Sequence, residues 1–257
     1  MGFAVGDLTK DKFLSGALEI MQPKVGFRAG VDSVFLAASV PACSGDTVLE
    51  LGCGAGVASL CLASRVQGVV LTGVEQQSDY ADLARRNAIA NGQKMAIHHT
   101  DLRELPPELL RESFDHVIAN PPYYLRDRGT AASDTGREAA LGETTPLVDW
   151  IDVATRRLKP KGYLTVIQDA ERLPALLRAI DGRLGSIKVL PLVPRIGRPA
   201  HLIVLQARKG GRAAFQLLAE MVMHQGIAHD GDKESYSPHI NAVLRSGAAL
   251  PLGDITK

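Results

Sequence analysis

Three closely spaced glycines directly after an apolar run place the strongest constraint on the fold of this chain. Residues 46–51 predict a buried strand, and Gly52, Gly54 and Gly56 follow it before residues 57–65, whose apolar side chains recur at helical spacing. Glycine allows a tight turn and lets a ligand approach the backbone closely. A strand, a glycine loop and a helix form the first unit of a doubly wound α/β sheet, which binds its ligand at the carboxyl ends of its strands.

The spacing of the glycines excludes two common nucleotide sites. A dinucleotide fingerprint requires glycine where Val57 stands, and the Gly-Lys-Ser/Thr of a P-loop does not follow. A second predicted strand, residues 69–75, ends at Glu75, about 20 residues past the glycine loop, where a carboxylate meets ribose hydroxyls. A third, residues 95–100, precedes Asp101, which is placed to accept a hydrogen bond from an adenine amino group. Together these residues predict a nucleoside site.

A stiff corner, Asn120-Pro121-Pro122-Tyr123, follows a fourth predicted strand, residues 114–119. Its two prolines remove two backbone donors and fix two φ angles. The side-chain oxygen of Asn120 and the carbonyl of Pro121 can each accept one N–H, and Tyr123 can stack on a flat ring. Taken alone, the corner is equally consistent with a rigid turn whose tyrosine packs in the core. Beside the glycine loop, it predicts a site for a planar substrate that carries an amino group.

In this order, the glycine loop with Glu50, the acids Glu75 and Asp101, and the corner at Asn120 resemble the class I S-adenosylmethionine-dependent methyltransferases that act on amino or amide nitrogens. Residues 22–37 and 201–211 also look like the bacterial tRNA(Val) adenine-N6 methyltransferases. The resemblance implies a Rossmann-like α/β fold, with a mostly parallel seven-stranded sheet, an antiparallel last strand and helices on both faces.

The resemblance also implies roles for individual residues, with S-adenosyl-L-methionine as the cofactor. It places the three glycines against the methionine moiety, Glu75 on the ribose and Asp101 near the adenine. We expect five more residues at the cofactor site: Arg28, Asp32, Glu50, Leu102 and Asn120. The implied reaction is methylation of the N6 atom of an adenine in RNA, with tRNA the expected partner. Asn120 and Pro121 would polarise the N–H bonds and Tyr123 would hold the base; no metal is required.

Other acceptors remain open at this point. The same tetrapeptide resembles guanine-N2 methyltransferases of ribosomal RNA and enzymes that methylate a glutamine amide of release factors. A methyltransferase for hydroxyl groups is disfavoured, because such substrates usually need a base or a metal. A different class is a non-catalytic RNA-binding protein that retains the fold. The oligomeric state is left undetermined.

Composition argues for a local rather than a global RNA-binding surface. The chain has 29 basic and 28 acidic residues, a net charge of +1. We expect part of a basic patch at the rim of the site to come from these residues: Arg126, Arg128, Arg137, Arg195, Arg198, Arg208, Lys209 and Arg212. Three cysteines without a CxxC pair indicate neither a zinc site nor disulfides. No signal segment and no apolar run of about 18 residues is visible, so a cytoplasmic protein without membrane contact is expected.

Three regions are expected along the chain. Residues 1–40 form a lid over the cofactor site, with a hairpin that pairs 18–21 with 25–28 and a helix at 31–38 capped by Asp32 or Ser33. Residues 41–211 form the methyltransferase domain. Within it, we predict a helix over 146–158, a break at 160–162 before a strand over 163–168, and an antiparallel pair, 186–193 with 200–207. Residues 212–257 are expected to form a partly ordered extension.

Overall fold

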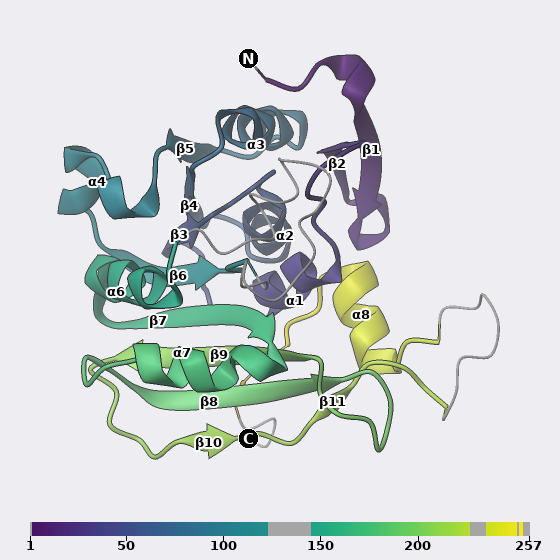
Figure 1. Cartoon of the computed structure of the whole chain (residues 1–257). Helices are drawn as coiled ribbons and strands as arrows, with labels where there is room; N and C mark the ends of the chain where they lie inside the picture. Colours follow the sequence, from purple (N-terminus) through teal and green to yellow (C-terminus); the bar gives the residue numbers. More distant parts are fainter. Residues whose placement is uncertain (1, 123–144, 227–234, 251, 254–257) are drawn as a thin grey trace.

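A computed structural model of the 257-residue chain describes residues 2–122, 145–226, 235–250 and 252–253. A large twisted sheet runs through the molecule, and a separate two-stranded hairpin precedes it (Figure 1). The strands are β1 Leu8–Phe13, β2 Leu18–Pro23, β3 Thr47–Leu51, β4 Val70–Glu75, β5 Met95–His99, β6 Phe114–Ala119, β7 Leu158–Asp169, β8 Leu184–Val193, β9 Leu202–Lys209, β10 Gln216–Leu217 and β11 Met221–Val222. The α-helices are α1 Val31–Ser39, α2 Val57–Arg65, α3 Ser78–Ala90, α4 Pro107–Arg111, α6 Leu147–Arg157, α7 Leu173–Ala179 and α8 Pro238–Ser246.

The order of the strands confirms the predicted fold class. The long strands lie in the order β5-β4-β3-β6-β7-β9-β8. Neighbours from β5 to β7 pair in parallel, and β9 pairs antiparallel with both β7 and β8. The very short strands β10 and β11 extend this sheet by pairing in parallel with β8, which brings it to nine strands. Because successive parallel strands are joined through helices, their carboxyl ends meet at one edge, which is where ligands bind.

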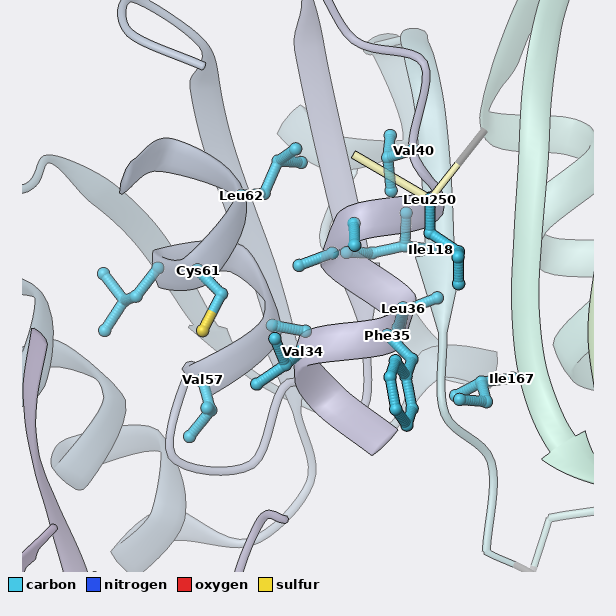
Figure 2. Packing of buried hydrophobic residues seen from close by; sticks show 14 of the residues in the cluster. Val34, Phe35, Leu36, Val40, Val57, Cys61, Leu62, Ile118, Ile167 and Leu250 are labelled. Atoms are coloured by element: carbon cyan, nitrogen blue, oxygen red, sulfur yellow. The ribbon is translucent and has the colours of Figure 1, made fainter. Parts of the chain in front are cut away.

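Successive side chains of the central strands point to opposite faces of the sheet, so the core is divided between the two faces. Val48 and Ile118 pack into a cluster with α1, α2 and α8, whereas Leu49 and Val117, one residue away, pack into a second cluster with α6 and α7. Figure 2 shows side chains of α1 and α2 against Ile118 and Ile167 in the first cluster. Burial on both faces explains why Val48 and Leu49 of β3, and Val117 and Ile118 of β6, are consecutive apolar residues.

The predicted N-terminal hairpin has the wrong partner. In the structure, β2 pairs with β1 through a tight turn at Leu14–Gly16, not with residues 25–28. Two asparagines, Asn87 of α3 and Asn91 at its C-cap, occupy the other edge of β2. Asn91 exchanges hydrogen bonds of 3.0 and 2.9 Å with the backbone of Glu19, and Asn87 exchanges bonds of 2.8 and 3.0 Å with that of Met21. These side chains replace a neighbouring strand. The sequence does not show this contact, because the asparagines lie far from β2 along the chain.

Two local predictions are also wrong. Gly30 occupies the N-cap position of α1 and no side chain caps the helix, so neither Asp32 nor Ser33 has the predicted capping role. Strand β7 begins at Leu158 and continues through Pro160–Gly162, where a break was expected. A register shift between Phe114 and His116 of β6, together with a positive φ of 69° at Lys161, absorbs the extra residues as a bulge.

The C-terminal region contributes to the core. Helix α8 packs against α1 with Ile240 and Val243 fully buried, and the backbone N–H of Leu250 donates to the carbonyl of Ala38 at 2.8 Å. The apolar face of α8 was not anticipated from the sequence. The division at residues 40 and 211 stays a prediction. None of the helices in the described part of the chain combines the length and apolar character that a membrane crossing requires.

Candidate functional site

The carboxyl ends of β3, β4 and β6 open into one cavity of about 340 Å³. The glycine loop and the Asn-Pro-Pro corner therefore share a single site, as the sequence predicts. Among the predicted site residues, those that line the cavity are Arg28, Asp32, Gly52, Gly54, Glu75, Asp101, Leu102, Asn120 and Pro121. Tyr123 lies outside the described residues, so its role stays a prediction.

The backbone conformation of the glycine loop, and a close neighbour at Gly52, disfavour side chains in the loop. Gly52 has a φ of 64°, and a Cβ atom added to it would lie 2.6 Å from Cη2 of Trp150. Gly54 has a φ of 52°, and its Cβ position lies 3.9 Å from the ring of Phe27. These φ values favour glycine. The bare backbone of the loop forms one wall of the cavity.

Glu75, at the end of β4, joins the glycine loop to the next turn. One oxygen of its buried carboxylate accepts the backbone N–H of Gly54 at 2.8 Å, and the other accepts that of Gln77 at 2.8 Å. Burial raises the pKa of this carboxyl group, and the two N–H donors act in the opposite direction. Each carboxylate oxygen can accept more than one hydrogen bond. A rigidly held acceptor pair on a cavity wall suits the two adjacent hydroxyls of a ribose.

Asp101 and Leu102 form the part of the wall that follows β5. The Asp101 carboxylate accepts hydrogen bonds from the backbone N–H of Arg103 at 2.8 Å, from the Arg103 side chain at 2.7 Å and from Gln76 at 3.2 Å. These bonds from Arg103 lower the pKa of Asp101. Beside this ionised acceptor, Leu102 and Val74 give the wall an apolar surface. Such a wall can hold a flat heterocycle that carries an amino group.

The corner after β6 presents a buried acceptor. Among the described residues, no donor reaches the side-chain oxygen of Asn120, although this atom is buried. The Pro121 carbonyl accepts a hydrogen bond of 3.1 Å from Nε2 of Gln168 on β7. An unpaired buried acceptor costs about 1–3 kcal/mol. A ligand that donates an N–H at this point would remove the cost.

Several residues of the cavity wall were missed by the sequence reasoning. Trp150, on α6, lines the cavity, and its buried indole N–H has no acceptor within the described parts of the chain. Tyr80, on α3, donates its hydroxyl to the carbonyl of Phe27 at 3.0 Å, and both residues line the cavity. In sequence, Trp150 and Tyr80 lie on apolar helix faces. That pattern does not separate a cavity wall from a core.

Two predicted cofactor residues are not among the residues that line the cavity. Glu50 points to α2, where the backbone N–H of Ser59 donates to its carboxylate at 3.1 Å and the Ser59 hydroxyl donates to the same oxygen. Gly56 is the N-cap residue of α2 with a φ of 81°, and its Cβ position would lie 3.5 Å from Ala84. Both residues therefore contact α2 or α3 on the side of the glycine loop that faces away from the cavity.

Burial raises the pKa of Glu50 to about 7 from its usual value of 4.5. The folded pKa is the higher one, so the proton stabilises the folded state fully below about pH 4.5, and this contribution is lost as the pH rises through about 7. We expect the free energy of unfolding of the wild type to fall relative to that of Glu50→Gln by on the order of 1–3 kcal/mol across this window. Denaturant titrations over a pH series test this; parallel curves for the two proteins would contradict it.

The predicted basic patch at the rim is wrong for part of its members. Because β9 runs antiparallel to β7, Leu202 pairs with Asp169 at the cavity edge, and Arg208 pairs with Tyr163 at the opposite end of the sheet. Lys209 and Arg212 follow Arg208 and lie away from the cavity edge. The described residue that fits the predicted patch best is Arg198, in the exposed turn between β8 and β9.

Three more arginines of the predicted patch, Arg126, Arg128 and Arg137, lie outside the described residues. Arg195 bonds to the carbonyls of Gln225 and Gly226 and to the hydroxyl of Ser235. Its guanidinium therefore anchors the C-terminal segment. For Arg198, a contact with RNA stays a prediction.

The residues of the cavity fit S-adenosylmethionine. The glycine backbone at Gly52 and Gly54 leaves room for the amino acid part, Glu75 offers acceptors for ribose hydroxyls, and the wall at Asp101 and Leu102 suits an adenine ring. The fit rests on the bare backbone of Gly54 at the cavity wall, and on the donor and acceptor chemistry of this wall.

Comparisons with known proteins agree with this site. The family model described as methyltransferase small domain matches residues 27–190. The chain is 26% identical over 231 residues to the tRNA1(Val) (adenine(37)-N6)-methyltransferase of Yersinia enterocolitica, covering 88% of this chain and 87% of that protein. It is 30% identical over 189 residues to the protein of the same name from Shewanella baltica, covering 70% and 76% of the two chains.

Solved structures show the same fold. A predicted O-methyltransferase from Agrobacterium tumefaciens superposes with a TM-score of 0.68 at 25% identity, over 86% of this chain and 98% of that one. The 16S rRNA N2 G1207 methyltransferase of Thermus thermophilus, solved with AdoMet and guanosine, has a TM-score of 0.54 at 22% identity, over 79% of this chain and 50% of that one. The second likeness concerns the fold alone.

Sequence, fold and cavity lead to the same assignment. The family model spans the glycine loop, Glu75, Asp101 and the Asn120 corner, and the relatives extend the match over most of the chain. The predicted fold class, type of enzyme and cofactor are thereby confirmed. The chain belongs to the methyltransferase small domain family and is an S-adenosylmethionine-dependent methyltransferase.

Proposed function

We propose that this protein methylates the N6 atom of an adenine in RNA, and that its substrate is a tRNA. The observation that carries the proposal is the buried side-chain oxygen of Asn120, which has no partner among the described residues and lies in the cavity that also contains Gly54 and Glu75. Relatives that match most of this chain are named for adenine-N6 methylation of tRNA. A tRNA substrate would place the reaction in the cytoplasm.

The corner accounts for the activation of a weak nucleophile. The lone pair of an adenine amino group is conjugated with its ring, so the free amine reacts poorly. Bound S-adenosylmethionine supplies an electrophilic methyl group. The Asn120 side chain and the Pro121 carbonyl would each accept one N–H bond and stabilise the positive charge that develops on nitrogen. As the N–CH₃ bond forms and the S–CH₃ bond breaks, the nitrogen loses one proton to water.

The environment of the corner suits a planar group that both donates an N–H and accepts a hydrogen bond. In the part of the chain that the structure describes, the cavity wall holds a buried acceptor without a partner, at Asn120, and a buried donor without a partner, the indole N–H of Trp150. Adenine offers the complementary pair, since its amino donor lies next to a ring nitrogen that accepts. Tyr123 would stack on a base extruded from the RNA.

Trp150→Phe tests the role of the indole donor. The variant keeps an aromatic ring but lacks the indole N–H. We therefore expect the KM for the RNA to rise about tenfold, which corresponds to the loss of one hydrogen bond. The dissociation constant of S-adenosylhomocysteine should stay within about twofold. Because Trp150 is buried in a core cluster, the smaller ring should lower the melting temperature, so both constants are measured on protein shown to be folded. An unaltered KM would show that the substrate does not use this donor.

The substrate class can be tested with purified wild-type protein and a methyl-labelled donor. Separate pools of unmodified tRNA, ribosomal RNA and release factor are incubated with the protein, and the label in each is counted. The proposal predicts label in tRNA. Label confined to ribosomal RNA or to the release factor would assign one of the alternative acceptors. If the donor binds and label appears in none of the pools, the reading as a non-catalytic RNA-binding protein becomes the better one.

A further inference from the structure

Gln168 is a fully buried polar residue beside the reactive corner. It lies near the end of β7, one strand away from β6, and its side chain is 0% exposed. Its Nε2 donates to the Pro121 carbonyl at 3.1 Å, and its Oε1 accepts the backbone N–H of Asp169 at 2.9 Å. These two bonds fix which end of the amide faces the corner. A donor is therefore held permanently against a carbonyl of the site.

The corner needs such an outside donor. Ala119, at the end of β6, pairs with Val166 of β7, but the next residues include Pro121 and Pro122, which have no N–H to continue the ladder of hydrogen bonds. The backbone beyond Asn120 is thus left without its usual anchors. The side chain of Gln168, two residues past Val166, reaches across from β7 and takes their place.

We propose that Gln168 is a positioning residue for methyl transfer, which fixes the Pro121 carbonyl so that this acceptor and Asn120 face the substrate amino group together. The inference rests on the proposed function. A carbonyl oxygen has two lone pairs, and the hydrogen bond from Gln168 occupies one of them. The other lone pair stays available to a substrate N–H, in an orientation set by the sheet and not by the substrate.

The first test is Gln168→Met, which keeps the length of the side chain and removes the donor. A shift of about 1 Å in a positioning contact can cost on the order of 10²-fold in rate. We expect kcat to fall by about 10–100-fold, while the dissociation constant of S-adenosylhomocysteine and the KM for tRNA change by less than about threefold. A fall in kcat without a change in KM or in cofactor affinity indicates a role in the transition state and not a general loss of binding.

Gln206→Met is the matched control. Gln206 is also a buried glutamine, on the adjacent strand β9, and its Nε2 donates to the Ser39 carbonyl at 3.3 Å and to the Thr165 hydroxyl at 3.4 Å. Its replacement leaves a similar buried polar group unpaired, away from the corner. The melting temperatures of the two variants should fall by comparable amounts, and only Gln168→Met should lose kcat.

Gln168→Glu tests the role through the pH dependence of kcat, which would not change if residue 168 served only in packing. A carboxyl group at this position donates to the Pro121 carbonyl only when it is protonated. The kcat of this variant should therefore rise as the pH is lowered, relative to Gln168→Met. Asp169, whose pKa is raised by its own burial and by the charges of Glu171 and Asp32, titrates in both variants, and in Gln168→Glu it titrates together with the new carboxyl group, so Gln168→Met reports the pH dependence that is present without that group. Arg172 and His201, which also act on Asp169, are unchanged as well.

The outcomes are distinguishable from those of the proposed function. If wild type methylates tRNA, and Gln168→Met keeps the kcat of Gln206→Met, the inference is wrong although the function stands. The inference is also wrong if the kcat ratio of Gln168→Glu to Gln168→Met does not change with pH. If wild type modifies another substrate, the same comparison is made with that substrate. Loss of kcat in Gln168→Met would then still support the positioning role.

Discussion

Replacing Asn120 with alanine is expected to lower kcat by on the order of 10³-fold while the affinity for S-adenosylhomocysteine changes by less than about twofold. The buried Asn120 oxygen has no partner in the described parts of the chain, and we assign it to the amino group of the substrate. Its removal takes away charge stabilisation that exists only during transfer. Single-turnover methylation of tRNA gives the rate, and calorimetry gives the cofactor affinity.

The Asn120→Ala protein should not be less stable than wild type. Its alanine replaces an unpaired buried acceptor, so the cost of burying that atom disappears. A melting temperature equal to or above that of wild type would support the assignment. If cofactor affinity and rate fell by the same factor, Asn120 would instead belong to the wall that holds the cofactor.

Replacing Glu75 with glutamine is expected to have the opposite effect, with loss of cofactor binding. Both oxygens of Glu75 accept backbone N–H groups, from Gly54 and from Gln77. An amide would turn its NH₂ group toward one of these donors, which opens the glycine loop, and it would lose charge-assisted bonds to ribose hydroxyls. We expect the dissociation constant of S-adenosylhomocysteine to rise about 100-fold or more.

Glu50→Gln is the matched control for this change. Glu50 is another buried carboxylate in the neighbouring strand, but its oxygen faces Ser59 and not the cavity. The variant should keep the affinity of wild type. Equal affinity of Glu75→Gln and wild type, measured by calorimetry on protein shown to be folded by circular dichroism, would remove Glu75 from the cofactor site.

The parts of the fold that sequence predicted are those whose signals are local. Buried strands that stop at Gly52, Glu75, Asp101 and Asn120 are recognisable one by one, and parallel pairing then brings their ends together. For this reason nine of the 19 residues that line the cavity were among those predicted. The resemblance to a family supplied the mostly parallel sheet with an antiparallel last strand, and the short connection between residues 193 and 200 predicted the antiparallel pairing of β8 with β9.

The predictions that were wrong concern contacts between segments distant in the sequence, or the direction in which a side chain points. The partner of β2 was missed because two asparagines of α3 complete its edge. Glu50 was misplaced because the sequence does not show that its carboxylate faces α2. Trp150 and Gln168 were missed because one looks like a core residue and the other like a polar residue near a strand end; only the fold brings both to the corner.

The most direct test of the account identifies the methylated atom. Unmodified tRNA is incubated with wild-type protein and S-adenosylmethionine, digested to nucleosides and analysed by mass spectrometry against standards, with Asn120→Ala in parallel. The account predicts N6-methyladenosine with wild type and none above background with the variant. A methyl group on guanine N2, on a ring nitrogen of adenine or on a ribose hydroxyl would contradict the assignment of Asn120 and Pro121 as acceptors for an adenine amino group.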